Sequence, residues 1–423
     1  SSFPAPRVSP DVDFVKLLFS ETNADINLSP DETKQLINQY GLSFTNDSSS
    51  KNKLLHPSEK LIFRHTTRAK ANVIIFFVES LSARFLTPYE SKFDSITPNI
   101  NHFSDYSTVV DGYYNHTTPT INGLLGQLNS IYPSFINEDF LETKQNFQTR
   151  SIINILNDHG YNTLLFSYEH KAFPLSQCLK GLGFYTTFFK QDLELKYNIK
   201  STRNDFLEDG DVLGCFTKYL SDNTPQKPFL AVVSTVNTHT GYQLSKKSLP
   251  YKDYNSSLLT AIHTMDNEFG KFWSFFINSK LKDNTIVILT ADHSLPVSVE
   301  LKDLYPEENF TNNLFDKIAL IIYDPVHKLP SRLKAHCSSI NLAPTVMHLL
   351  SIDSISSHFQ GHSIFDNPTD STFLSIYSGA VYEKRINEKT FIDRRTNYLI
   401  SNWLKYNQQL FRNNKLIPTK SQY

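Results

Sequence analysis

Two stretches of the chain have the same arrangement of apolar and polar residues. Residues 72–78 lead into Glu79 and Ser80, and residues 285–290 lead into Asp292 and His293. Apolar, β-branched and aromatic runs of this length are typical of strands covered on both faces, as in a parallel sheet. Ligands of such sheets bind at the carboxyl ends of the strands. The pattern predicts that Glu79, Asp292 and His293 meet at one edge, where two carboxylates and an imidazole can hold a divalent cation.

Strand-like and helix-like segments alternate through the central part of the chain. This order predicts βαβ units, and therefore an α/β fold with a doubly wound, mostly parallel sheet and helices on both faces. The strand-like segments are 72–78, 163–167, 229–236, 285–290 and 318–323, and the helix-like segments lie near 120–130, 150–158, 204–221, 256–280 and 340–351.

The ends of the chain differ from this pattern. Residues 1–70 are predicted to form a helical lead-in and linker, because 29–32 is a helix start with an N-cap serine and a capping-box glutamate, and 46–53 is a polar tract. The main domain is expected over 71–370. Short alternating segments in the last part, such as 372–377, predict a small antiparallel subdomain over 371–423.

Composition narrows the classes of function. Lys and Arg total 41 against 42 for Asp and Glu, so the net charge of −1 carries no electrostatic signature of nucleic-acid binding. The three cysteines have no CxxC spacing, which excludes a disulfide framework and a thiolate zinc site. No stretch approaches the ~20 apolar residues of a membrane-spanning helix. The chain is expected to be soluble as given, and its start without methionine suggests a fragment.

Thr117 is the candidate nucleophile. It lies beside Thr118 and Pro119, just before an apolar stretch that predicts a helix. The free N–H groups and dipole of a helix N-terminus favour an anion such as a phosphoryl group. A bound cation would lower the pKa of the threonine hydroxyl. Taken singly, each of these residues also has a structural interpretation, since Thr-Pro sequences form turns and a carboxylate at a strand end is often a cap.

The ordered set of motifs resembles the alkaline phosphatase and sulfatase superfamily, in particular its lipoteichoic acid synthase branch of phosphoglycerol and phosphoethanolamine transferases. The likeness runs from about residue 72 to 365 and implies an alkaline-phosphatase-like fold with a sulfatase-like catalytic domain. Its motifs are Asn72–Ser80, Thr97-Pro98-Asn99, Thr117–Thr120, the Gly160-Tyr161-Asn162-Thr163 passage, Asp266–Gly270, Asp292-His293 and Ile340–Thr345.

The resemblance implies that Glu79, Thr117, Asp292 and His293 bind one divalent metal and that Thr117 forms a covalent phospho-intermediate. His239 is similar to the family histidine that contacts the substrate phosphate, and it is also a candidate acid for the leaving alcohol. His170 is a further candidate for substrate binding. By analogy the metal is Mn²⁺, with Zn²⁺ or Mg²⁺ as alternatives.

By the same resemblance, the protein is expected to move phosphoglycerol or phosphoethanolamine from phosphatidylglycerol or phosphatidylethanolamine to a cell-envelope glycan or glycolipid. This chemistry implies the outer face of the cytoplasmic membrane and a missing N-terminal anchor. Segment 172–177 lacks the Trp and Arg of lipoteichoic acid synthases, which leaves the headgroup open, and threonine at 117 argues against a sulfatase. The alternatives are a phosphodiesterase or phosphatase that uses water as acceptor, and a non-catalytic binding module.

Overall fold

The computed structural model of the chain describes the part that carries the predicted sheet. The described residues are 70–133, 151–201, 205–223, 225–241, 244–308, 316–352, 359–366, 372–377 and 380–385. The predicted lead-in therefore lies outside them except for Lys70, as does the chain after Arg385. The division into three domains stays a prediction.

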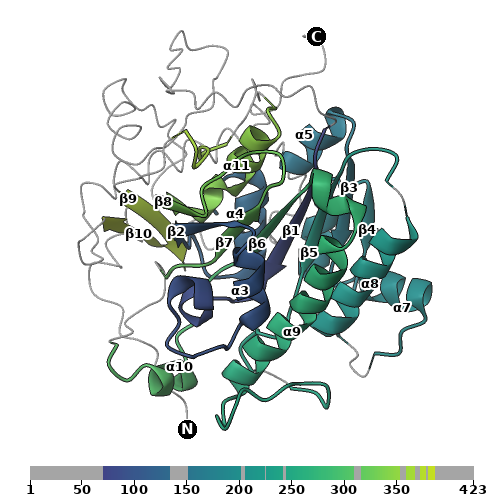
Figure 1. The fold of residues 1–423 in the computed structure, drawn as a ribbon. Coiled ribbons are helices and arrows are strands. Elements are labelled where there is room, and N and C mark those ends of the chain that lie inside the picture. The colour runs from purple at the N-terminus through teal and green to yellow at the C-terminus, as the bar shows by residue number, and fades with distance from the viewer. Residues whose placement is uncertain are drawn as a thin grey trace, which may run out of the picture.

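The described residues form one large sheet and one small one (Figure 1). The large sheet has eight strands in the order β4-β3-β5-β1-β6-β7-β2-β8, and all neighbours are parallel except that β7 is antiparallel to β6 and β2. The prediction of a mostly parallel sheet is confirmed. Its strands are β1 (Asn72–Val78), β2 (Thr108–Tyr114), β3 (Asn162–Phe166), β4 (Thr186–Phe188), β5 (Phe229–Ser234), β6 (Thr285–Ala291), β7 (Leu320–Tyr323) and β8 (Arg332–Ser338).

The small sheet is an antiparallel pair of strands, β9 (Thr372–Tyr377) and β10 (Ala380–Arg385). It lies where the sequence predicts antiparallel structure. The rest of that region, including the alternating segment 390–393, is outside the described residues.

Helices form a layer on each face of the large sheet (Figure 1). In one layer α9 packs against both α8 and α3, and in the other α4 packs against α5 and α11. Right-handed crossovers account for this division, because connections that run in opposite directions along the sheet place their helices on opposite faces. The helices are α3 (Pro98–Ser104), α4 (Thr120–Asn129), α5 (Ile152–Asp158), α6 (Pro174–Gly181), α7 (Lys190–Tyr197), α8 (Asp209–Asp222), α9 (Ser257–Ile277), α10 (Val299–Leu304) and α11 (Leu342–Leu349), with 3₁₀ turns at η1 (Ala83–Phe85), η2 (Thr87–Tyr89), η3 (Lys280–Asn284) and η4 (Ser339–Asn341).

The three central strands β5, β1 and β6 are buried along their whole length. Helices cover both faces, which is why their sequences are nearly continuous apolar runs and do not alternate. Asn72 is the polar exception at the start of β1. Its Nδ2 donates to Thr285 Oγ1 (3.1 Å), and its Oδ1 accepts from the Phe229 N–H (3.2 Å), so one side chain ties together the starts of all three strands. No helix among the described residues is both long and apolar enough to cross a bilayer.

Three strands of the sheet were missed by sequence analysis. β2 contains Asp111 and Gly112, and its register with β8 shifts between Val110 and Gly112. β8 is the edge strand, and its first residues, including Arg332 and Lys334, are largely exposed. β4 has only three residues. None of the three forms the long apolar run by which a buried strand is recognised.

Two motifs of the family resemblance, the Thr-Pro-Asn segment and Asp266, contact each other. Asp266 of α9 accepts hydrogen bonds from the N–H groups of Asn99 (3.0 Å) and Ile100 (2.8 Å) in the first turn of α3. A carboxylate at this position satisfies N–H groups that have no partner within the helix. The Thr-Pro-Asn motif and Asp266 therefore join α3 to α9.

Helix α4 lies against the backbone at the exit of β6. A Cβ atom on Gly123 would come within 2.3 Å of the carbonyl oxygen of Asp292, a backbone atom directly after β6 that cannot rotate away as a side chain could. Gln127 Nε2, one turn further along, donates to the carbonyl oxygens of Ala291 (2.8 Å) and Asp292 (3.0 Å). Glycine at position 123 therefore permits the close approach of helix and sheet.

We expect the substitution Gly123→Ala to lower the free energy of unfolding by about 1–3 kcal/mol, the usual cost of overpacking. Gly214 in α8 is a matched control, because a Cβ there meets nothing within 4 Å. Gly214→Ala should raise stability by up to about 1 kcal/mol, since alanine is the better helix former. Urea unfolding of the two variants checks this, and equal effects of both substitutions would contradict the close approach at Gly123.

Candidate active site

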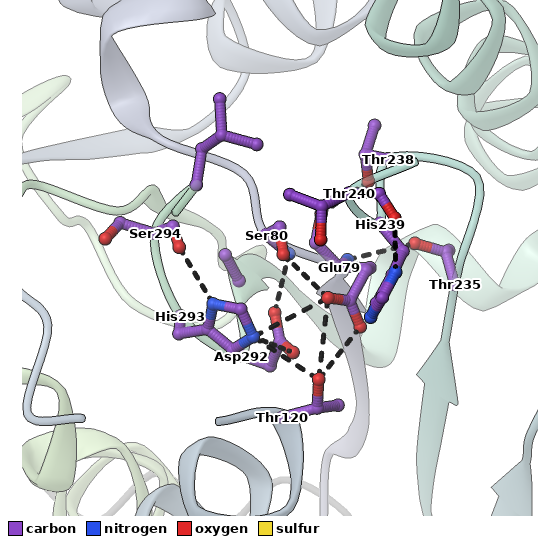
Figure 2. Close-up of polar contacts among 12 residues, drawn as sticks. Glu79, Ser80, Thr120, Thr235, Thr238, His239, Thr240, Asp292, His293 and Ser294 are labelled. Carbon is purple, nitrogen blue, oxygen red and sulfur yellow. Dashed lines mark hydrogen bonds and ion pairs between the residues drawn. The ribbon is translucent and has the colours of Figure 1, made fainter. Parts of the chain in front are cut away.

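Two neighbouring strands, β1 and β6, deliver polar residues of the site to the edge of the sheet formed by the carboxyl ends of the strands. β1 and β6 are in register up to Val78 and Ala291, so the residues that follow, Glu79 and Asp292, leave the sheet side by side. Glu79, Asp292 and His293 are all buried, and one ligand atom from each lies within 4.8 Å of the others. Figure 2 shows their side chains pointing toward one another. The structure thus brings these three predicted residues together.

The backbone leaves β1 through a strained turn. Ser80 has a φ of 52°, in the left-handed region that few residues other than glycine adopt. Its N–H donates to Asp292 Oδ1 (2.8 Å) and its Oγ donates to Glu79 Oε1 (2.7 Å). Ser80 therefore holds the two carboxylates in place, and these two hydrogen bonds help offset the strain.

The buried carboxylates of Glu79 and Asp292 are close enough to affect each other's ionisation. Burial raises the pKa of Glu79 well above its usual value, and the negative charge of Asp292 raises that pKa further. Hydrogen bonds donated by Ser80 and Thr120 act in the opposite direction. A second negative charge at Glu79 is therefore unfavourable unless a positive charge compensates it.

His293 directs its Nε2 at the carboxylates. Its Nδ1 donates to the Ser294 carbonyl oxygen (2.8 Å), which can only accept. Nε2 lies 3.3 Å from Asp292 Oδ2 and 3.5 Å from Glu79 Oε1. In the described part of the chain Asp292 Oδ2 is buried and has no hydrogen-bond partner. Two carboxylates and an imidazole nitrogen that converge in this way fit a divalent cation with oxygen and imidazole ligands.

The hydroxyl that meets these ligands is that of Thr120. Its Oγ1 lies 3.3 Å from Glu79 Oε2 and 3.3 Å from His293 Nε2 (Figure 2). Thr120 is the first residue of α4, after Pro119 as N-cap, and its side chain is partly exposed. A group at this position combines access from solvent with the positive end of the helix dipole.

Thr117, the nucleophile predicted from the sequence, occupies a different place. It is fully buried in the turn between β2 and α4, three residues before the helix begins. The sequence analysis selected Thr117 because it comes just before a predicted helix. The helix begins at Thr120, which directly precedes the apolar stretch that starts at Ile121.

The two other predicted histidines lie in loops at the same edge of the sheet. His239 follows β5 and is exposed, and Figure 2 shows its ring beside Glu79. His170 follows β3, and its Nδ1 accepts from the Ala172 N–H (3.1 Å) while its ring packs against Phe173. His170 is not part of the cluster in the described part of the chain. The role of each in substrate binding stays a prediction.

Sequence comparison places the chain among proteins with this fold. A profile of the Sulfatase family matches residues 71–352. "Lipoteichoic acid synthase-like YvgJ" of Bacillus subtilis is 22% identical over 301 residues, which cover 67% of this chain and 48% of the relative. "Lipoteichoic acid synthase 2" of the same organism is 23% identical over 305 residues, 67% of this chain and 45% of the relative. The chain spans about half the length of these curated relatives.

Solved structures show the same fold. The lipoteichoic acid synthase LtaP from Listeria monocytogenes superposes with a TM-score of 0.66 at 17% identity, covering 84% of this chain and 94% of that one. The C-terminal periplasmic domain of EcEptC from Escherichia coli superposes with a TM-score of 0.55 at 14% identity, covering 78% and 94%. These similarities confirm the predicted alkaline-phosphatase-like fold.

His116 supports the turn that leads into α4. Its Nε2 lies 3.3 Å from the Asn122 carbonyl oxygen and its Nδ1 2.5 Å from Ser339 Oγ. The carbonyl can only accept, so Nε2 carries the proton and Nδ1 accepts from the serine. Burial lowers the pKa of His116 to about 3. The ring is therefore neutral at physiological pH.

Stability should fall in acid because of this histidine. The unfolded chain binds a proton at His116 below about pH 6.5 and the folded chain only near pH 3, so this contribution to stability is present above pH 6.5 and lost as pH falls toward 3. We expect His116→Gln to reduce the slope of unfolding free energy against pH by up to about 1.4 kcal/mol per unit in that window. Urea unfolding at a series of pH values, with a chelator present to remove metal ions, measures the slope.

Proposed function

We propose that this chain, which belongs to the Sulfatase family, is a metal-dependent transferase that moves a substituted phosphoryl group through a phosphothreonine at Thr120. The observation that carries the proposal is the position of the Thr120 hydroxyl, 3.3 Å from both Glu79 Oε2 and His293 Nε2 at the start of a helix. Relatives named lipoteichoic acid synthases support transfer as the reaction. Thr120 replaces Thr117 as the proposed nucleophile, because Thr117 is fully buried.

Glu79, Asp292, His293 and Thr120 would hold the cation. When bound, the cation compensates the charge of the two carboxylates and lowers the pKa of the threonine hydroxyl. We propose Mn²⁺, with Zn²⁺ or Mg²⁺ as alternatives, because the donor set combines oxygen atoms with one imidazole nitrogen. The Oδ2 of Asp292, which has no hydrogen-bond partner in the described part of the chain, and the nearby Nε2 of His293 support this use of the site.

The residues of the chain then have distinct tasks. Thr120 Oγ1, whose hydroxyl proton is released to solvent, forms the new bond to phosphorus while the bond from phosphorus to the diacylglycerol oxygen breaks. The N–H groups at the start of α4 stabilise charge on the phosphoryl oxygens. His239 is proposed to donate a proton to the departing alcohol, since its ring is exposed on the loop beside Glu79 (Figure 2). An acceptor hydroxyl displaces Thr120 in the second step.

The donor we propose is phosphatidylglycerol or phosphatidylethanolamine, and the acceptor a glycan or glycolipid of the cell envelope. Relatives named for lipoteichoic acid synthesis support this class of substrate, and a neighbour described as a periplasmic domain supports a site outside the cytoplasm. We accordingly place the active domain at the outer face of the cytoplasmic membrane.

Removal of the proposed ligand Glu79 should strongly weaken metal binding. We expect Glu79→Gln to weaken Mn²⁺ binding by more than the roughly 10–100-fold that loss of an outer-shell partner costs. Glu169→Gln is the matched control, because Glu169 is a partly buried carboxylate in the loop after β3 that bonds only locally, to the Ser176 N–H (3.1 Å) and hydroxyl (3.0 Å). Isothermal titration with Mn²⁺ measures both variants. Equal affinity of Glu79→Gln and wild type would place the ion elsewhere.

A covalent adduct should form at Thr120. After incubation with vesicles of phosphatidylglycerol or phosphatidylethanolamine, intact-mass analysis should show an added phosphoglycerol or phosphoethanolamine group on wild-type protein. Thr120→Ala should show none, because the attacking oxygen is missing, whereas Thr117→Ala should retain the adduct if it folds. The mass added identifies the headgroup.

The reverse outcome, with the adduct lost in Thr117→Ala and kept in folded Thr120→Ala, would return the nucleophile to Thr117. Labelled lipid incubated with and without a glycan acceptor separates transfer from hydrolysis. Release of a free headgroup phosphate at the same rate in both conditions would identify a phosphodiesterase. Absence of any adduct or turnover in the metal-loaded wild type would indicate a binding module.

A further inference from the structure

The loop after β5 is attached on one side to the backbone of Glu79. The Glu79 N–H donates to Thr235 Oγ1 (3.2 Å), and the Thr238 hydroxyl donates to the Glu79 carbonyl oxygen. Both threonines are buried, whereas His239 in the same loop is exposed. Thr235 and Thr238 thus hydrogen-bond to the backbone of Glu79, whose side chain is one of the proposed metal ligands (Figure 2).

On its other side the loop is attached to Asp209, the first residue of α8. Asp209 Oδ1 accepts from the N–H groups of Val236 (2.7 Å) and Asn237 (3.0 Å). The Asp209 N–H donates in return to Asn237 Oδ1 (3.3 Å). The Val236 carbonyl oxygen accepts from the His239 N–H (2.9 Å). Asp209 therefore holds Val236 by its N–H, and the carbonyl oxygen of Val236 in turn holds the backbone of His239.

The carboxylate of Asp209 is costly where it lies. The side chain is fully buried, and Oδ2 has no hydrogen-bond partner among the residues that the structure describes. Burial raises the pKa of Asp209 to about 7 against the opposing effect of the two N–H donors. A buried acid with one unpaired oxygen is a poor contributor to stability. The favourable contacts of this carboxylate are its two hydrogen bonds to the loop, from the N–H groups of Val236 and Asn237.

We propose that Asp209 is a positioning residue that fixes the loop 235–239 so that His239 faces the phosphoryl group at Thr120. The inference rests on the proposed function, in which His239 serves the departing alcohol. In the described part of the chain the hydrogen bonds of the Asp209 carboxylate go to the loop and not to Glu79, Asp292 or His293, so it acts through the loop. Loss of its carboxylate leaves Val236 and Asn237 without an acceptor and frees His239 to turn away.

A double-mutant cycle tests this inference. Asp209→Ala should lower kcat for transfer from phosphatidylglycerol or phosphatidylethanolamine by about 100-fold, the cost of misplacing a catalytic group by about 1 Å, with little change in KM. In a His239→Ala background the same substitution should cost almost nothing further. Asp209→Asn should restore most of the activity, because its amide oxygen can accept both N–H groups.

Asp211 offers the matched control. It lies in the same first turn of α8, and its carboxylate pairs with Lys247 (3.1 Å) and not with the loop. Asp211→Ala should leave kcat unchanged. If Asp209→Ala lowers kcat by the same factor with and without His239, the two residues act independently and the inference fails.

Amide hydrogen exchange supplies a readout that needs no activity. In wild-type protein the N–H groups of Val236 and Asn237 should exchange far more slowly than that of exposed Gly241, and in Asp209→Ala their protection should be lost while Mn²⁺ affinity stays at the wild-type value. If Asp209→Ala does not fold, Asn237→Ala, which removes only the return hydrogen bond, should show a smaller loss of protection. Unchanged exchange at Val236 in the folded variants overturns the inference. Absence of transfer in wild type would overturn the proposed function alone, since the exchange result still decides the role of Asp209.

Discussion

The adjacency of two buried carboxylates is the constraint on which the site depends. Glu79 and Asp292 leave neighbouring strands at the same level because β1 and β6 are in register to their last residues. Like charges brought together away from water are unfavourable, and hydrogen bonds from Ser80 offset only part of the cost. The proposed cation, held between the two carboxylates and His293 Nε2, would remove this conflict.

The position of Thr120, the proposed nucleophile, follows from how α4 meets the exit of β6. Gly123 allows the helix to touch the Asp292 backbone, and Gln127 fixes it there through the carbonyl oxygens of Ala291 and Asp292. Thr120, one turn before Gly123, is thereby carried to the ligands on a rigid element. A group held on a helix can keep the accuracy that attack on phosphorus requires, whereas a side chain on a free loop would lose it.

Glu79 also links the proposed metal ligands to the proposed acid. Its carboxylate faces His293, while its backbone is gripped by Thr235 and Thr238 of the loop that carries His239. Asp209 holds that loop from the opposite side. The contacts of Thr235 and Thr238 with Glu79 are separate from those that Asp209 makes with Val236 and Asn237. Loss of the Asp209 contacts is therefore expected to release His239 while Glu79 stays in place.

The sequence alone predicted much of the fold, because burial on both faces leaves a local signature. The apolar runs at β1, β5 and β6 are visible without coordinates, and so are the acids and the histidine at their ends. Strands β2 and β8 left no such signature, since a register shift and an exposed edge interrupt their apolar patterns.

Spacing along the chain could not decide which threonine reaches the cluster. Thr117 and Thr120 are both threonines within two residues of Pro119, and their positions relative to the cluster depend on where α4 begins and how it packs on Asp292. The role of Asp209 was equally hidden, because its partners Val236 and Asn237 lie far along the chain. Local pattern determined the strands and the kinds of residue at their ends. Only tertiary packing decided which hydroxyl and which loop contacts complete the site, since those contacts join residues that are distant in sequence.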